Sequence, residues 1–541
     1  MRFLVLLVAV AVAYAVLLQP PGCNQTAHYG LVQSLARGTP RIDRVKDETC
    51  DTAYVDGHYF AAKAPGLALA TLPWFELLRA VRVVPTNPHL HAGFPQAMLA
   101  LPRRALWQVG LFGAVLPALI LLLLSRRVAD EIAPGTGLAV AAAIGLGTLL
   151  LPFATVFFAH VLAACLGFAA FAVLLFRRST IAAGLLAGLA ICVDFSLALV
   201  AAVLLVYTWR QAPRFAAGVV TGVLPLLAFD LWAFRNPLHL SYANAVRVPG
   251  ASGHDVLGAN ASGFFGIGVP SFRVGAELLF SPRGLLLLSP VLIAALAGLV
   301  RLGRGPHRRE AIAAAAVFAL FLVYNAGYYL PFGGYVPGPR FLIATIPFLG
   351  LGLAAAFAAW PFVTSVLGAF SIGAMTVATA AEPLLGNDDT HSWVVRWRHG
   401  DFARSVLTQF GIGHGWLAVL PFLAAIGVAV IAAAPRTRFA LPALVPVAAV
   451  AVLFLAAPDL LHTDRAVRQS TGLVALVVLV AALIVLVVRR DRLALLAGVP
   501  LVALVVPGFA SHTKQALAVS ALSLVAAAAS EARRRRTATP A

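Results

Sequence analysis

Residues 24–66 read NQTAHYGLVQSLARGTPRIDRVKDETCDTAYVDGHYFAAKAPG and form the first long polar segment of the chain. This segment follows a single apolar run, and the sequence after it consists mainly of further apolar runs. Four aspartates lie within it, namely Asp43, Asp47, Asp51 and Asp56. The pattern predicts a polar region between a first membrane helix and a larger helical bundle.

The composition identifies the class of protein. The chain has 541 residues, of which 61% are hydrophobic and 11% are charged, whereas soluble domains have roughly 45–50% apolar and about 25% charged residues. We therefore expect an all-α polytopic membrane protein. The net charge of +19 does not indicate a nucleic-acid partner, because the arginine pairs lie at the ends of apolar runs, where basic residues determine topology.

The first apolar run, residues 3–19, is long enough to cross a membrane, and we interpret it as a transmembrane helix rather than a cleaved signal peptide. A second run at 64–84 is ambiguous. If it crossed the membrane, Arg126 and Arg127 would fall outside, against the positive-inside rule. We therefore assign 20–103 to one outward-facing region that carries short interfacial helices.

The first interfacial helix is predicted at 25–37, with Asn24 or Thr26 as its N-cap and Gly38 after its end. Further spans are predicted at 104–125, 137–157, 159–176, 213–233, 284–302, 309–330, 341–360, 361–382, 416–434, 440–457, 471–489, 492–510 and 514–530, which gives a bundle of about 14–16 transmembrane helices.

The run 180–208 is too short for two full spans, although basic residues flank both of its ends. Two short helices that turn near Asp194 satisfy both constraints, provided that the turn is buried or faces water. Both termini are then cytoplasmic, and the main outward loops are 20–103, 234–283, 331–340 and 383–415. The expected divisions are an N-terminal module at 1–235, a second part of the core at 236–382 and a C-terminal transmembrane module at 383–541.

Two of the four cysteines, Cys23 and Cys50, fall in the first outward region, while Cys165 and Cys192 fall in apolar runs. An extracytoplasmic compartment permits a disulfide, so we expect a Cys23–Cys50 bridge; two free thiols are the alternative. No metal-ligand spacing such as CxxC or HExxH is present, and the metal requirement stays open.

Polar residues gather at the outer ends of the predicted spans. His160 begins one span and Arg340 begins another, while Lys63, Asp43 and Asp51 lie in the outward region. An acid that activates a hydroxyl, together with cations that hold a phosphate leaving group, suits a group-transfer reaction. The simpler interpretations are a snorkelling lysine, an interfacial arginine and a histidine hydrogen-bonded within the bundle.

The layout of one helix, a long outward loop with interfacial helices and then a bundle resembles the GT-C superfamily of polyprenyl-phosphate-sugar-dependent glycosyltransferases. The stretch from Tyr59 to Pro65, YFAAKAP, is similar to the Tyr-Phe-x-Lys-Pro-Pro motif of the lipid A aminoarabinose transferase branch. In that branch the lysine contacts the lipid-linked phosphate, so the resemblance implies this role for Lys63. We expect His58, Tyr59 and Arg340 to bind the phosphate of the lipid-linked donor together with it.

Other motifs look closer still to uncharacterised bacterial proteins grouped with the protein O-mannosyltransferase and aminoarabinose transferase families. They are Ile42-Asp43, Asp51-Thr52-Ala53-Tyr54, Ser281-Pro282-Arg283-Gly284-Leu285 and Gly338-Pro339-Arg340. The resemblance extends to about residue 350.

The sequence departs from the superfamily pattern at one important place. Members usually carry the catalytic aspartate immediately after the first helix, where this chain has Asn24-Gln25. An amide is not a useful base, so either Asp43 or Asp51 is the base or the chain does not catalyse the usual transfer. The second acid of many relatives corresponds to His160, which then serves as a base or a metal ligand.

The resemblance implies transfer of a sugar from a polyprenyl-phosphate donor to a lipid, glycan or protein acceptor, at the outer face of a bacterial cytoplasmic membrane. The expected partners are the lipid-linked sugar, membrane lipids and the acceptor, with a divalent metal ion as an open question. One alternative is a transporter or flippase for a lipid-linked glycan, on whose side Asp194 is the only feature. The other alternative is a catalytically inactive protein of the same fold, which Asn24-Gln25 favours.

Overall fold

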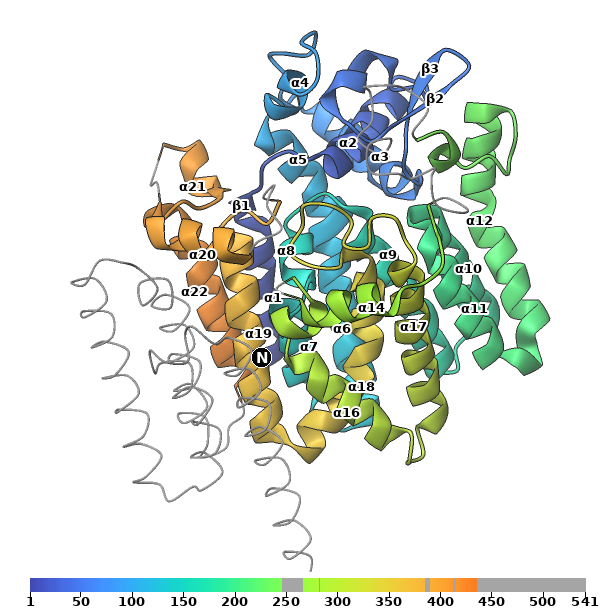
Figure 1. Cartoon of the computed structure of the whole chain (residues 1–541), viewed down its shortest axis with the longest axis vertical. Helices are drawn as coiled ribbons and strands as arrows, with labels where there is room; N and C mark the ends of the chain where they lie inside the picture. The colour runs from blue at the N-terminus through green and yellow to red at the C-terminus, as the bar shows by residue number, and fades with distance from the viewer. Residues whose placement is uncertain (246–265, 282, 385–389, 412–414, 435–541) are drawn as a thin grey trace, which may run out of the picture.

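The computed structural model describes residues 1–245, 266–281, 283–384, 390–411 and 415–434. Within them the chain is a helical bundle with a polar N-terminal region over one end (Figure 1). The predicted spans 440–457, 471–489, 492–510 and 514–530 lie outside the described residues, as does most of the predicted module 383–541.

Six helices in the described ranges are long and apolar enough to cross a membrane, and five shorter apolar helices accompany them. The six are Arg103–Ile132, Trp209–Phe234, Arg308–Ala326, Arg340–Ala359, Pro361–Ala380 and Trp416–Ala433. This confirms the expected class of helical polytopic membrane protein.

The bundle contains most of the helices. Their bounds are α1 Arg2–Ala15, α5 Arg103–Gly110, η2 Leu111–Val115, α6 Leu116–Ile132, α7 Gly137–Gly147, α8 Leu150–Ala154, α9 Ala159–Leu175, α10 Thr180–Val193, η3 Phe195–Leu197, α11 Ala198–Tyr207, η4 Trp209–Gln211, α12 Ala212–Phe234, η5 Ser241–Asn244, α14 Phe272–Phe280, α15 Leu285–Leu288, α16 Val291–Leu302, α17 Arg308–Ala326, η6 Arg340–Thr345, α18 Ile346–Ala359, α19 Pro361–Ala380, α20 Thr390–His399, α21 Val406–Gln409 and α22 Trp416–Ala433.

Several boundaries differ from the sequence prediction. The helix predicted at 104–125 continues to Ile132, so Arg126 and Arg127 lie inside it rather than at its end. The span predicted at 137–157 is broken, because Thr148 has extended backbone angles between α7 and α8. The span predicted at 284–302 is also broken after Leu288, immediately before Pro290, whose nitrogen cannot donate to a helix.

The predicted hairpin of two short helices is confirmed, with α10 and α11 on either side of Asp194. Helix α10 packs against α12 along a stripe of glycines spaced four residues apart, namely Gly184, Gly188, Gly218 and Gly222. A Cβ atom at any of these positions would meet the backbone of the opposite helix. Small residues permit this close approach in membrane bundles.

The N-terminal region holds α2 Cys23–Leu35, η1 Asp43–Glu48, β2 Thr52–Val55, β3 His58–Ala61, α3 Gly66–Ala80 and α4 Gln96–Leu99. The predicted helix at 25–37 is therefore confirmed, but its predicted caps Asn24 and Thr26 are wrong, because Gly22 is the N-cap. Eleven of the thirteen residues of α2 are buried. This helix thus lies inside the protein rather than along its surface.

Strands β2 and β3 form an antiparallel hairpin that pairs Thr52 with Ala61 and Val55 with His58. Asp56 and Gly57 make its turn with φ angles of 49° and 85°. Asp-Gly is the residue pair that two-residue hairpin turns favour, so the sequence contained a signal for this hairpin. A second small pair joins β1 Leu17–Leu18 to β4 Arg404–Ser405 and ties the end of the first helix to the segment before α22.

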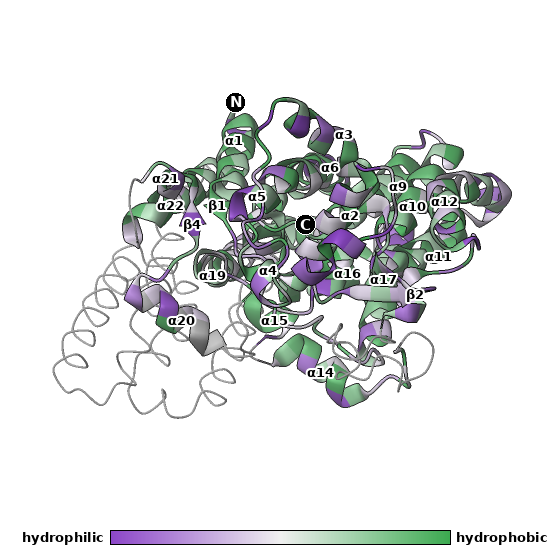
Figure 2. Ribbon diagram, turned by 90° about the horizontal axis from the view of Figure 1, so that it is seen from above, coloured by the Kyte–Doolittle hydropathy of each residue, from purple (hydrophilic) through white to green (hydrophobic). Residues whose placement is uncertain are grey.

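Figure 2 shows the molecule from above, coloured by hydropathy. Helices α6 and α10 are mostly green, whereas purple residues appear around α4, α5 and β2. Figure 1 shows the N-terminal region over one end of the bundle, so the boundary between the two is where polar side chains meet the ends of apolar helices.

Candidate active site

A cavity of about 390 Å³ lies where the N-terminal region meets the bundle. Its polar lining residues come from separate elements: Asn24 and His28 from α2, Lys63 from the turn after β3, His160 from α9, Asp194 and Ser196 from the α10–α11 turn, Tyr242 from η5, Tyr324 from α17, Tyr328 from the loop after α17 and Arg340 from η6. Residues that the sequence placed at the outer ends of spans thus share one space.

The β2–β3 hairpin positions Lys63. Its ladder continues beyond the strands, since Ala62 N donates to Asp51 O at 2.9 Å, and this register sets Asp51 beside Lys63. The Lys63 Nζ atom lies 2.8 Å from Asp51 Oδ2, with side-chain exposures of 11% and 10%. Burial lowers the pKa of Lys63, the Asp51 carboxylate opposes that shift, and the Arg340 charge adds to it.

Arg340 begins η6 and is 8% exposed. Its guanidinium carbon lies 5.3 Å from the ring centre of Phe158 and 5.1 Å from that of Phe341, so two aromatic faces hold it. Its Nε atom is buried without a hydrogen-bond partner, and it makes no ion pair within the described ranges. The Asp51 carboxylate acts electrostatically on Arg340 as well as on Lys63, so two buried cations share one carboxylate. The remaining positive charge offers a place for an anion.

His160 and Asp194 form the second polar pair of the cavity. His160 Nδ1 lies 3.0 Å from Asp194 Oδ2, while Asp194 Oδ1 accepts hydrogen bonds from Ser196 N and Oγ. A carboxylate only accepts, so His160 Nδ1 carries a proton and donates it to Asp194 Oδ2. The aspartate at the helix break therefore caps η3 and orients the histidine at the same time.

Two lining residues were not selected from the sequence as members of the site. Asn24 lines the cavity, and its buried Oδ1 has no partner in the described part of the chain. His28 is 1% exposed and its Nδ1 is likewise unpartnered. Burial, then the Lys63 and His160 charges, lower the pKa of His28 to about 3, so this ring is neutral near pH 7. The sequence did offer a signal for Asn24, which stands immediately after the first helix where the resemblance led us to expect a catalytic aspartate. For His28, only burial of α2 would have been a signal.

Three tyrosines add hydroxyl groups beside the cations. The Tyr242 hydroxyl contacts those of Tyr328 and Tyr329, the latter at 3.0 Å, and Lys63 Nζ lies 6.0 Å from the ring centre of Tyr242. Burial raises the pKa of Tyr242 and Tyr328 well above the usual value. They are thus neutral hydroxyls, which can donate to oxygen atoms of a sugar or a phosphate.

Asp43, His58 and Tyr59 do not line the cavity. Asp43 Oδ2 lies 2.9 Å from His58 Nδ1, and Asp43 Oδ1 accepts from Tyr59 N at 2.7 Å. The Asp43 and His58 side chains are 43% and 39% exposed. These contacts fasten η1 to β3. Asp51 does not line the cavity either, but its carboxylate contacts Lys63, which does, so of the two candidate bases Asp51 is the one beside a cation of the cavity.

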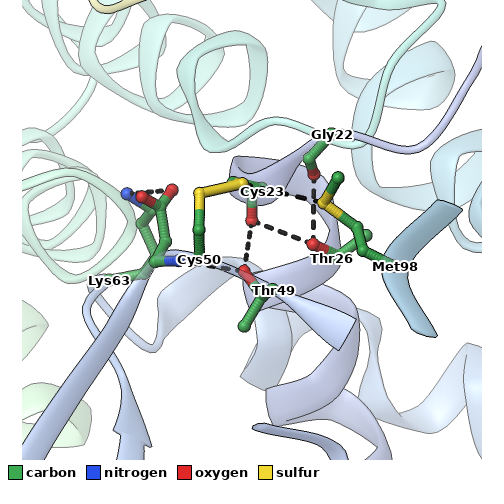
Figure 3. The surroundings of a disulfide bond; sticks show 8 residues. Gly22, Cys23, Thr26, Thr49, Cys50, Lys63 and Met98 are labelled. Atoms are coloured by element: carbon green, nitrogen blue, oxygen red, sulfur yellow. Dashed lines mark hydrogen bonds and ion pairs between the residues drawn. A yellow bond between two sulfur atoms is a disulfide. The ribbon is translucent and has the colours of Figure 1, made fainter. Parts of the chain in front are cut away.

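The expected disulfide is present and joins Cys23 of α2 to Cys50, the residue before Asp51 (Figure 3). Figure 3 shows the bridge on one side of the hairpin base with Lys63 close to it. Among the described residues, no group of three His, Cys, Asp or Glu side chains has the arrangement of a metal site.

Two solved structures are similar to this chain in fold. One is ArnT from Cupriavidus metallidurans in the apo state, with 16% identity over 85% of this chain and 78% of that chain and a TM-score of 0.45. The other is ArnT from the same organism bound to undecaprenyl phosphate, with 14% identity over 98% of this chain and 77% of that chain and a TM-score of 0.44.

No protein-family model and no curated protein sequence matches the chain. Both structural similarities concern the fold.

Proposed function

We propose that this chain is a membrane glycosyltransferase that moves a sugar from a polyprenyl-phosphate donor to an acceptor hydroxyl at the outer face of a bacterial cytoplasmic membrane. The observation that carries the proposal is Arg340, a buried guanidinium without an ion-pair partner in the described ranges, facing a cavity that also holds Lys63. One lipid-linked phosphate would satisfy both cations.

Lys63 forms an ion pair with Asp51, and in the proposed mechanism the donor phosphate breaks this pair. A phosphate that enters beside Arg340 competes with Asp51 for Lys63 Nζ, because its oxygens carry charge and Asp51 lies only 2.8 Å from the nitrogen. Separation of Lys63 from Asp51 then places a carboxylate that has lost this ion pair next to the leaving group. Donor binding and formation of the base are then coupled.

In the transfer step, Asp51 accepts the proton of the acceptor hydroxyl while the hydroxyl oxygen bonds to the anomeric carbon. The bond from that carbon to the phosphate oxygen breaks, and polyprenyl phosphate leaves with the bonding electron pair. Lys63 and Arg340 stabilise the charge that develops on it. His160, held by Asp194, and the tyrosine hydroxyls orient the sugar.

The test is transfer by the purified full chain from polyprenyl-phosphate-linked sugars, followed by mass spectrometry of the products. We expect Lys63→Met and Asp51→Asn each to reduce the rate by about 100-fold or more. The same loop offers matched controls, since Lys46 and Asp47 form an exposed ion pair. Lys46→Met and Asp47→Asn should retain the wild-type rate, and full activity of the Lys63 and Asp51 variants would refute the assignment.

A second candidate function is binding of the lipid-linked donor without transfer. The amide of Asn24 at the cavity and the engagement of Asp51 by Lys63 favour it. Binding of polyprenyl phosphate that depends on Arg340, without product from any sugar donor, would support this candidate over the enzyme.

A further inference from the structure

The bundle contains a second and larger cavity at its opposite end. Its volume is about 1320 Å³, and the residues around it belong mainly to the ends of α6, α9 and α11 and to the starts of α10, α12 and α17. Helix α9 runs from His160 at the candidate active site to Leu175 at this second cavity. Its 17 residues correspond to about 25 Å, so the two cavities lie on opposite sides of the bundle.

Positive charge dominates the second cavity. Five arginines line it, namely Arg177, Arg178, Arg210, Arg214 and Arg309, against two glutamates, Glu131 and Glu310. Glu310 is engaged, because Tyr207 donates to its Oε1 at 2.8 Å and His307 lies 3.9 Å from its Oε2. Within the described part of the chain, Arg177, Arg178, Arg210 and Arg214 make no ion pair.

The helix ends do not add to this charge as a group. Three helices, α10, α12 and α17, begin at the cavity, and three, α6, α9 and α11, end there. Helix N-termini carry partial positive charge and helix C-termini carry partial negative charge, so the two sets offset each other. The arginine side chains are therefore what favours an anion in this hollow.

Aromatic residues indicate where the cavity sits in a membrane. Trp209 is 65% exposed, and the Arg210 guanidinium lies 5.3 Å from the centre of its ring. Tyr207 carries Arg309 over its ring at 5.1 Å. Exposed tryptophan with arginine is typical of the level of lipid headgroups. Topology alone accounts for arginines at this end, but not for their convergence on a hollow of this size.

We propose that this second cavity binds the phosphate headgroup of an anionic phospholipid from the leaflet opposite the candidate active site. Basic pockets between transmembrane helices recognise such headgroups. Acidic diacyl lipids fit the site because their chains can lie along the apolar surface beside exposed Val206 while the phosphate meets the arginines. This inference does not depend on glycosyl transfer.

The test measures lipid binding to the full-length chain in detergent by native mass spectrometry, with phosphatidylglycerol, phosphatidylcholine and inorganic phosphate as probes. The test variant is Arg178→Gln with Arg214→Gln. The matched control is Arg301→Gln with Arg304→Gln, which removes two exposed arginines near the start of α17 that do not line the cavity.

We expect the wild type to prefer phosphatidylglycerol over phosphatidylcholine, and the test variant to bind phosphatidylglycerol roughly thirtyfold more weakly. The control variant should bind as the wild type does, and circular dichroism should show equal helix content in all three proteins. Equal loss in test and control variants, equal binding of phosphatidylcholine, or displacement of the lipid by millimolar inorganic phosphate would each overturn the proposal.

Discussion

Lys63 Nζ lies 2.8 Å from Asp51 Oδ2, and both side chains are about nine-tenths buried. In the same N-terminal region, Lys46 and Asp47 form a pair of nearly the same length, 2.9 Å, whose side chains are 39% and 38% exposed. The nitrogen–oxygen distance is almost the same in the two pairs, whereas the exposure of their side chains differs. Comparing the pairs therefore shows how burial changes the contribution of an ion pair to stability.

Removing one member of the buried pair should destabilise the protein far more than removing one member of the exposed pair. Asp51→Asn leaves Lys63 without its counter-ion next to Arg340, which costs about 3 kcal/mol, whereas Asp47→Asn costs at most about 1 kcal/mol. The apparent midpoint of thermal denaturation in detergent compares the two variants. Equal midpoints would mean that water or another group replaces Asp51.

Close packing of α10 on α12 leads to a second prediction. Gly222→Ala places a methyl group against Leu185 O and the backbone of α10, which should destabilise the protein by about 1–3 kcal/mol. It should also displace Asp194, which follows α10, and so reduce transfer activity. Gly427→Ala in α22 is the control, because a Cβ there meets no atom within 4 Å.

Alanine is the better helix former by about 1 kcal/mol, so the control variant should denature at or above the wild-type temperature. A Gly222→Ala protein that also denatures at the wild-type temperature would contradict close packing at this position. The thermal midpoints of Gly222→Ala and Gly427→Ala, measured in the same detergent, separate the effect of the steric clash from the effect of alanine on helix stability.

The sequence predicted the convergence of Lys63, His160 and Arg340 because each begins or adjoins an apolar run, and span counting places such residues at one end of a bundle. It did not separate Asp51 from Asp43. That choice depends on the register of the β2–β3 hairpin, in which Asp51 O accepts from Ala62 N, while η1 directs Asp43 towards His58. Long-range strand register cannot be deduced from a count of spans.

Helix α2 was predicted as an element but not as part of the site. Its polar residues suggested a surface position, yet Asn24 and His28 are buried against the cavity. Asp194 was predicted at a helix turn, and its pairing with His160 arises only when α9 and α10 pack together. Buried polar side chains in membrane proteins are usually retained for function. A hydropathy pattern, which assigns polar residues to the surface, therefore places residues such as Asn24 and His28 wrongly.

The disulfide gives a third prediction. The Cys23–Cys50 bridge spans 27 residues, a loop whose closure contributes about 3 kcal/mol. Replacing both cysteines by alanine should lower the thermal midpoint, and dithiothreitol should lower the wild-type midpoint to a similar value without affecting the variant. Because Cys50 precedes Asp51, activity should fall in parallel. A wild-type midpoint that reductant leaves unchanged would show that the bridge does not stabilise the hairpin base.

The fourth prediction concerns pH and His28, whose pKa falls from 6.5 to about 3 in the folded protein. The unfolded chain takes up a proton below pH 6.5 that the folded chain does not. Above pH 6.5, His28 is neutral in both states and does not lower the free energy of unfolding. As the pH falls from 6.5 towards 3, protonation of the unfolded chain lowers that free energy by up to about 1.4 kcal/mol per pH unit.

Thermal midpoints of wild type and His28→Gln between pH 7 and pH 5 test this, because titration of all other groups cancels in the difference. We expect the wild type to lose stability more steeply than His28→Gln, whereas His91→Gln, which alters an exposed histidine, should follow the wild type. Parallel curves for wild type and His28→Gln would mean that His28 becomes protonated in the folded state. A charged His28 beside Lys63 and Arg340 would then make the cavity more cationic at low pH, and phosphate binding would strengthen rather than stay constant.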